Sequence, residues 1–266
     1  MGKALEVITG AATAPSAILT ALTMASGDSL TVRKAVADSP VNLVALWTKN
    51  QTTGIVQLRS PLFHDNVRGI QARAVSADPE NILPFGFRQK VRPLDQLVAS
   101  ISGSAAAGDL EIACMMLAYD DLDGIAARFT TPQAVRQAAL NLVTVDVSIA
   151  AATGPNWTGA EALNADSDLL KGETDYALLG FDFSVLCAAA SVRGSDTGNL
   201  RLACPGNTTD KYTTNNWFVL LSDALQQPWI PIINSSNKGN TFIEVVQDEN
   251  AAAVTVSLLL AELPKA

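Results

Sequence analysis

The sequence contains one histidine, His64, which lies in the polar stretch PLFHDN. A catalytic triad or dyad with histidine as its general base would have to use this residue. The Gly-x-Ser-x-Gly motif, which presents a nucleophilic serine, does not occur in the sequence. A histidine in a polar loop with no paired nucleophile is typical of a surface side chain, and we interpret His64 as one.

The stretch GDSL at positions 27–30 resembles the nucleophile block of one lipase family, with Ser29 as the nucleophile. That family also needs an Asp-x-x-His pair downstream. At that spacing, Pro61 stands before His64. We therefore interpret Asp28 and Ser29 as parts of a turn.

The stretch GSDTG contains Asp-Thr-Gly, the core of aspartic protease sites, with Asp196 as its carboxylate. Such sites need a second carboxylate that shares a proton with the first. The residue 144 positions earlier, which the internal repeat described below makes equivalent, is Thr52. A threonine cannot replace that carboxylate, so the stretch predicts a turn before a strand.

The residue types that bind metals or cofactors are not arranged as a site. The three cysteines are far apart and form no Cys-x-x-Cys pair, which is typical of buried apolar cysteines rather than of zinc ligands. Carboxylates cluster at 120–123 and 166–175 without the spacing of a calcium-binding loop. The sequence therefore predicts no catalytic, cofactor-binding or metal-ligating residue, and we expect the chain not to be an enzyme. The cysteines are Cys114, Cys187 and Cys204.

Composition excludes several other classes. The chain has 266 residues, 48% of them hydrophobic and 17% charged, which excludes a disordered protein. Its net charge of −8 repels phosphate, so sequence-specific nucleic-acid binding is not expected. The first 28 residues lack the pattern of a signal peptide, and no apolar run is long enough to span a bilayer. We expect synthesis and folding in a cytoplasm.

Two helices are predicted, each opened by a proline. One follows Pro15 in the stretch SAILTALTMA, and the other follows the N-cap candidate Thr131 and Pro132. Runs that alternate with period two or are apolar throughout predict strands over most of the remaining chain. The runs are 29–36, 41–48, 53–60, 67–75, 80–91, 95–104, 108–119, 143–150, 176–194 (two strands), 198–205, 216–223, 228–236, 240–248 and 252–263.

Two of these runs, GIVQLRSP (Gly54–Pro61) and GNLRLACP (Gly198–Pro205), share glycine, leucine and proline at the same places. Their spacing of 144 residues can be kept without a gap to the last strand of each half, where the run from Leu110 meets the run from Val254. We predict an internal duplication. Upstream of Gly54 the spacing fails, and the polar segment 153–175 is interpreted as an insertion in the second copy.

About eight short strands in each half, with turns at regular spacing, predict β-sandwiches of the jelly-roll type. The fold class is therefore all-β: two tandem jelly-roll β-sandwiches with a few short helices. We expect an N-terminal segment with a short helix (1–28), a first jelly roll (29–128), and a linker helix with a second jelly roll (129–266).

The stretches GIVQLRSP…ILPFGFRQKVRPLDQLVASISGSAAAGDLEIACMMLAYDDL and GNLRLACP…QPWIPIINSSNKGNTFIEVVQDENAAAVTVSLLLAEL carry a resemblance of organisation. They resemble the double jelly-roll major capsid proteins of tailless icosahedral (corticovirus- and tectivirus-like) bacteriophages. The resemblance implies a pseudo-hexameric homotrimer that tiles a shell, with neighbouring trimers, penton proteins and minor capsid proteins as partners. It implies localisation in the virion after assembly in the host cytoplasm, and leaves open whether a membrane lies beneath the shell.

Two other classes of function stay open. The first is a tandem β-sandwich binding module of the lectin or adhesin kind, against which we weigh the lack of a signal peptide. The second is an enzyme built on two sandwiches, against which we weigh the lack of a usable histidine or metal-ligand set.

Overall fold

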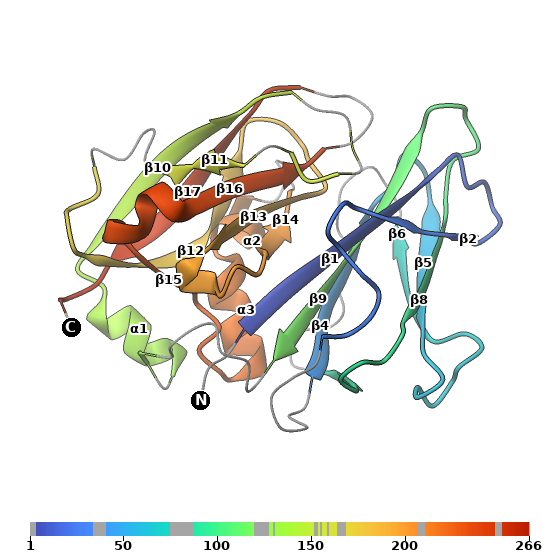
Figure 1. Ribbon diagram of the computed structural model, residues 1–266, viewed down its shortest axis with the longest axis horizontal. Coiled ribbons are helices and arrows are strands. Elements are labelled where there is room, and N and C mark those ends of the chain that lie inside the picture. Colours follow the sequence, from blue (N-terminus) through green and yellow to red (C-terminus); the bar gives the residue numbers. More distant parts are fainter. Residues whose placement is uncertain are drawn as a thin grey trace.

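The computed structural model describes most of the chain, and four antiparallel sheets account for most of that part (Figure 1). The predicted all-β class with a few short helices is confirmed. The described residues are 4–33, 41–74, 88–119, 128–129, 131–151, 154, 156–158, 160–163, 169–206, 211–247 and 252–265.

Strands β1 to β9 form the first sandwich, roll 1. Its first sheet has the order β3-β1-β9-β4-β7 and its second sheet the order β2-β8-β5-β6. The strands are β1 (Ala4–Thr13), β2 (Thr20–Ala21), β3 (Thr23–Met24), β4 (Val41–Lys49), β5 (Gly54–Arg59), β6 (Ile70–Ala74), β7 (Gln89–Val91), β8 (Val98–Ser102) and β9 (Leu110–Tyr119).

Strands β10 to β17 form the second sandwich, roll 2, with a first sheet β10-β17-β12-β15 and a second sheet β11-β16-β13-β14. These strands are β10 (Asn141–Ile149), β11 (Glu161–Ala162), β12 (Asp175–Phe183), β13 (Ala189–Gly194), β14 (Leu202–Pro205), β15 (Ile232–Asn234), β16 (Thr241–Val246) and β17 (Val254–Glu262). The helices are α1 (Pro132–Ala138), α2 (Lys211–Asn215) and α3 (Trp217–Leu225), with the short 3₁₀ helices η3 (Ser195–Thr197) and η4 (Ser235–Asn240).

Both rolls have one topology. Counted along the chain, roll 2 pairs its strands as 1-8-3-6 and 2-7-4-5. Roll 1 pairs its strands in the same way once the short strand β3, which adds to the edge at β1, is set aside. Two four-stranded sheets connected in this order make a jelly roll. The tandem jelly rolls predicted from the sequence are confirmed.

The strand pairing supports the duplication but corrects its register. Strand β5, which begins at Gly54, is the fourth strand of its roll, whereas the residues that follow Gly198 form β14, the fifth strand. The proposed match between these two stretches is therefore wrong. The pairing makes Ile70 equivalent to Leu202, a difference of 132, and Val91 equivalent to Ile233, a difference of 142.

The step between those differences locates the true insertion in roll 2. It lies between β14 and β15, where α2 and α3 occur. Segment 153–175, which we expected to be the insertion, connects β10 to β12 as a segment of similar length connects β1 to β4 in roll 1. A Cβ at Gly180 in β12 would lie 2.1 Å from the Thr214 carbonyl oxygen, so glycine allows the inserted helices to approach this strand closely.

A β-bulge at the same place in both rolls supports the duplication independently. The register of β4 against β9 shifts between Leu43 and Ala45, and that of β12 against β17 shifts between Leu178 and Gly180. The two bulged sites are 135 residues apart, as are the strands that carry them. A bulge adds one unpaired residue and bends its strand, and it is kept because the surrounding packing depends on it.

Two helix predictions and one strand prediction need comment. The helix after Pro15 is wrong, since the chain there forms turns and the short strands β2 and β3. Segment 1–28 is not separate from roll 1 either, because β1 pairs with β9 along its whole length. The run 216–223, predicted as a strand, is mostly α3, whose buried Trp217, Leu221 and Leu225 follow helical spacing.

The second predicted helix, α1, is confirmed. The Thr131 side chain accepts a hydrogen bond from the Ala134 amide, and Pro132 opens the helix. The helix ends at Ala138, so Leu142, which was expected on its apolar stripe, lies in β10 instead.

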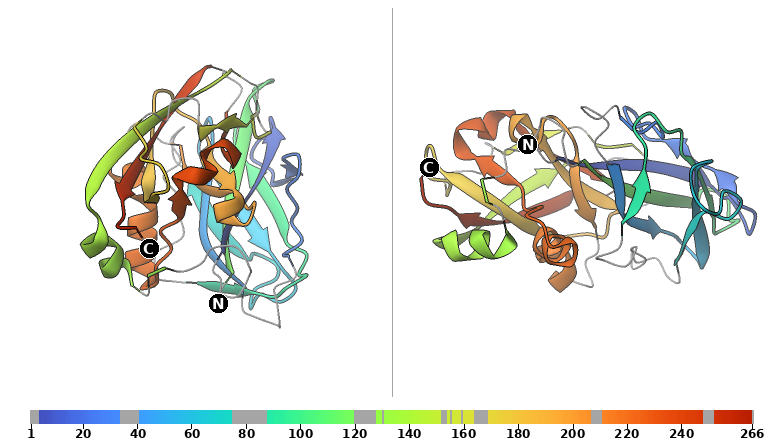
Figure 2. Two further views of the ribbon diagram at one scale, coloured as in Figure 1. Left: turned by 60° about the vertical axis from the view of Figure 1, so that its left-hand side comes forward. Right: turned by 90° about the horizontal axis from the view of Figure 1, so that it is seen from below.

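The four sheets stack as layers, with the first sheet of roll 1 next to the second sheet of roll 2 (Figures 1 and 2). Strands β1, β4 and β9 are buried on both faces as a result. In β9, Met115 and Leu117 pack into roll 1, while Cys114 and Met116 pack towards roll 2. This double burial explains why these strands read as continuous apolar runs.

Trp47 lies at the centre of the contact between the rolls. Its indole N–H donates to the Ala188 carbonyl of roll 2 at 3.0 Å, and its ring meets the Trp217 ring edge-on at 5.8 Å between centroids. The side chain is fully buried.

We expect W47A to lower the free energy of unfolding by about 3–5 kcal/mol, because it removes a large buried ring from a contact that cannot close around the cavity. Urea unfolding followed by circular dichroism measures this. The control L142A, at an exposed position, is expected to change stability by less than about 0.5 kcal/mol. Equal effects of the two substitutions would contradict the assignment.

Candidate inter-roll polar site

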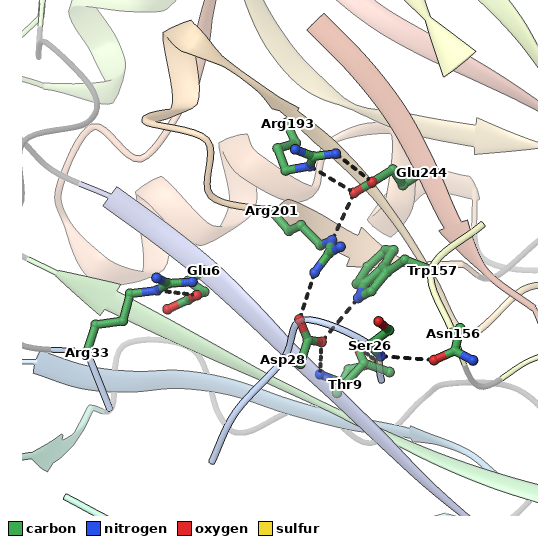
Figure 3. Close-up of polar contacts among 11 residues, drawn as sticks. Glu6, Thr9, Ser26, Asp28, Arg33, Asn156, Trp157, Arg193, Arg201 and Glu244 are labelled. Atoms are coloured by element: carbon green, nitrogen blue, oxygen red, sulfur yellow. Dashed lines mark hydrogen bonds and ion pairs between the residues drawn. The ribbon is translucent and has the colours of Figure 1, made fainter. Parts of the chain in front are cut away.

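A cluster of charged side chains lies at the junction of the two rolls and surrounds a pocket of about 250 Å³ (Figure 3). It contains three carboxylates and three guanidinium groups, contributed by both rolls. The carboxylates are those of Glu6, Asp28 and Glu244, and the guanidinium groups are those of Arg33, Arg193 and Arg201.

Asp28 of roll 1 is positioned by the turn that follows β3. Gly27 adopts φ +85°, which favours glycine, and the turn carries the Asp28 carboxylate back to β1. There it accepts a hydrogen bond from the Thr9 amide at 2.8 Å. Its other partners belong to roll 2: the Trp157 indole N–H at 3.1 Å and the Arg201 guanidinium at 2.7 Å.

Arg201 connects the two rolls. Besides Asp28 it binds Glu244 in β16 at 2.8 Å, and Glu244 also pairs with Arg193 in β13 at 2.9 Å. The Arg201 guanidinium lies over the Trp157 ring, 5.2 Å from its centroid, in a cation–π contact. The Arg201 carbonyl accepts a hydrogen bond from the Val7 amide of β1, so both main chain and side chain join the rolls.

Glu6 forms a second, smaller group beside this one. Its carboxylate accepts hydrogen bonds from the Arg33 side chain at 2.6 Å and from the Tyr119 hydroxyl at 2.8 Å. Burial and the adjacent Glu6 raise the pKa of Tyr119 well above its ordinary value, so this phenol remains a donor.

Burial also raises the pKa of Asp28 above its ordinary value of 3.8, while the bonds from Thr9 and Trp157 and the charge of Arg201 oppose the shift. All six charged groups are paired within the cluster. The arrangement therefore supplies cohesion between the rolls, with no unpaired nucleophile or base directed into the pocket.

The structure distributes the residues that were considered for catalysis. His64 lies exposed in the β5–β6 loop, as interpreted from the sequence. The Ser29 hydroxyl accepts from the Thr31 amide in an exposed turn. Asp196 accepts from the Asn234 amide at 3.0 Å and from the Asn237 side chain at 2.7 Å, so it holds a turn together.

The metal-binding candidates do not assemble into a site in the described part of the chain, where no group of three or more suitable side chains is found. The three cysteines are free and buried, as predicted, and burial raises the pKa of the Cys114 thiol to about 12. Of the second carboxylate cluster, Asp175 pairs with Arg128 at 2.6 Å, and Glu173 is exposed. Carboxylates 120–123, 166 and 168 lie outside the described residues.

Sequence reasoning missed the role of Asp28. It was interpreted as an ordinary turn residue, and the turn is present, but the side chain is buried between the rolls. Nothing local distinguishes it, because its partners Trp157 and Arg201 are more than a hundred residues away.

Comparison with known proteins adds little to this geometry. No protein-family model and no curated protein matches the sequence. Similar solved structures include the PBSX exported protein XepA (8% identity, TM-score 0.29, covering 97% of this chain and 86% of that one). They also include a structure of Sulfolobus Turreted Icosahedral Virus (7% identity, TM-score 0.21, 100% and 82% covered) and one described as the triple jelly-roll fold and turret assembly in an archaeal virus (8%, 0.20, 100% and 81%). At these scores the likenesses carry no argument about this chain.

The described residues include no helix with the length and hydropathy needed to cross a membrane.

We expect R201A to lower the free energy of unfolding by about 3 kcal/mol, because it leaves the Asp28 and Glu244 carboxylates, each 5% exposed, without their shared partner. The matched control is R136A. Arg136 pairs with Asp223 where both side chains are more than 40% exposed, so its loss should cost less than about 1 kcal/mol. Similar costs for both variants would show that the inter-roll cluster is not a main source of stability.

A second prediction concerns pH. Because the folded protein binds the Asp28 proton more tightly than the unfolded chain does, this group favours folding increasingly as the pH falls from 7 towards 4. The variant D28N lacks this titration, so the stability of the wild type relative to D28N should rise over that range. Urea unfolding at pH 7, 5.5 and 4 measures the difference, and a constant or falling difference would be the contrary result.

Proposed function

We propose that this chain is a viral structural protein, the major capsid subunit of a tailless icosahedral virus, and that it assembles as a homotrimer. In the trimer, six jelly rolls from three chains form a pseudo-hexameric ring. Neighbouring trimers, penton proteins and minor capsid proteins are its partners in the virion. In this role the chain catalyses no reaction.

The observation that carries the proposal is the way the two equivalent rolls contact each other. The outer face of the first sheet of roll 1 packs on the second sheet of roll 2, and the buried contact makes the pair a rigid unit. Roll 2 has an equivalent first sheet, and roll 1 has an equivalent second sheet, at opposite ends of the stack (Figure 1).

The same kind of contact can therefore be repeated between chains. A contact that joins two different surfaces head to tail produces a closed ring when its rotation closes, and an open filament when it does not. Six similar rolls related by similar rotations close a ring of three chains. Such a ring has a nearly hexagonal outline, which is the shape that tiles the faces of a shell.

The alternative, a lectin- or adhesin-like binding module, uses the same fold class. Sugar-binding sites of such modules commonly offer an exposed aromatic ring to the sugar. Here the four tryptophans are buried or half-buried, and Trp157 is covered on one side by Arg201. This observation favours assembly over sugar binding.

Native mass spectrometry of the purified chain tests the proposal. We expect a trimer of about 84 kDa, three times the 27.9 kDa of the chain, and negative-stain electron microscopy should show plates or shells built of such units. A protein that stays monomeric at high concentration would contradict the capsid role. Binding of the monomer on a glycan array would then support the alternative.

A further inference from the structure

The outer faces of the two first sheets are equivalent in topology but opposite in character. The strand pairing makes Trp47 equivalent to Asp182. In roll 1 this face is covered by roll 2 and is largely apolar. In roll 2 the face is polar and open, with Thr144 and Asp146 exposed and Ser257 half-buried.

Two carboxylates stand in one row on the open face. Asp146 in β10 and Asp182 in β12 both pair with Ser257 of the strand between them. Adjacent strands are about 4.8 Å apart, so the two aspartates are separated by about 10 Å across the sheet. Beside this row lie Leu142, 73% exposed, and Leu140, 58% exposed.

The opposite end of the stack carries the complementary charge. On the second sheet of roll 1, Val56 and Leu58 face the core, so their neighbours on β5 face outwards. These include Arg59, opposite the 43%-exposed Val98, and Ile55, opposite the exposed Arg73 of β6.

We propose that these two faces bind each other between neighbouring copies of the chain. Asp146 and Asp182 of one copy lie against Arg59 and Arg73 of the next, with Leu142 and Val98 as apolar contacts. This inference rests on the proposed function and names the surface through which the trimer closes.

A second copy is the occupant that the charges favour. Opposite charges on two distant faces attract head to tail, whereas two acidic or two basic faces brought together by a twofold axis would repel. The chain as a whole is acidic, with a net charge of −8, so a face that carries two arginines is a specific feature of its surface. The exposed leucine and valine supply apolar area at both faces.

Charge reversal tests the pairing. Each of D146K and R73E should weaken trimer formation at least tenfold, measured by native mass spectrometry across a dilution series in low salt. The double variant D146K/R73E should recover most of that loss, because the charges face each other again. The matched control is D146K/K90E, in which Lys90 is an exposed cation on β7, outside the proposed face, and no recovery is expected.

Cross-linking provides a measurement that does not depend on stability. In R73K, a carbodiimide should join the new amine to Asp146 or Asp182 of another chain. Positions 73 and 146 lie at opposite ends of one molecule (Figure 1), so the linked peptides report a contact between chains. Thermal unfolding of each variant checks that it is folded.

The outcomes separate the two proposals. A wild-type chain that stays monomeric overturns the proposed function, and the surface with it. A wild-type trimer whose dissociation is unchanged by both reversals, and whose R73K form gives no such cross-link, overturns the surface and leaves the capsid role standing. Recovery in the double variant together with the cross-link supports both.

Discussion

The burial of one sheet on both of its faces governs the rest of this structure. Strands β1, β4 and β9 contribute side chains to the core of roll 1 on one face and to the contact with roll 2 on the other. Water is excluded from both sides, so these strands must be apolar throughout, and each polar group among them needs a partner. A rigid two-roll unit follows, since the rolls cannot separate without exposing a complete sheet face.

The charged cluster gives this apolar contact its geometry. Packed aliphatic faces resist separation but specify their relative position weakly, whereas hydrogen-bonded ion pairs require particular distances and directions. The bonds from Arg201 to Asp28 and Glu244, with the Trp157 contacts, therefore define how roll 2 sits on roll 1. Because both carboxylates are nearly excluded from water, each depends on this arginine.

The two rolls also show how exposure changes a duplicated module. The strand order and the bulge are the same in both, since they follow from backbone pairing. The outer faces differ because one is covered within the chain and the other is not. Where roll 1 has Trp47 under roll 2, roll 2 has Asp182 on an open face, and a surface of this kind suits a contact that forms only on assembly.

The sequence by itself determined the strand-rich fold, the two-roll plan and the helix at Pro132, because alternation and capping are local properties. It could not determine the register of the repeat, since a few shared residues at Gly54 and Gly198 outweighed a difference that the inserted helices create further along. Tertiary burial decided that Trp217 begins a helix and that Pro15 does not. It also decided the importance of Asp28, because a carboxylate becomes an essential link only when folding removes it from water and brings Arg201 beside it.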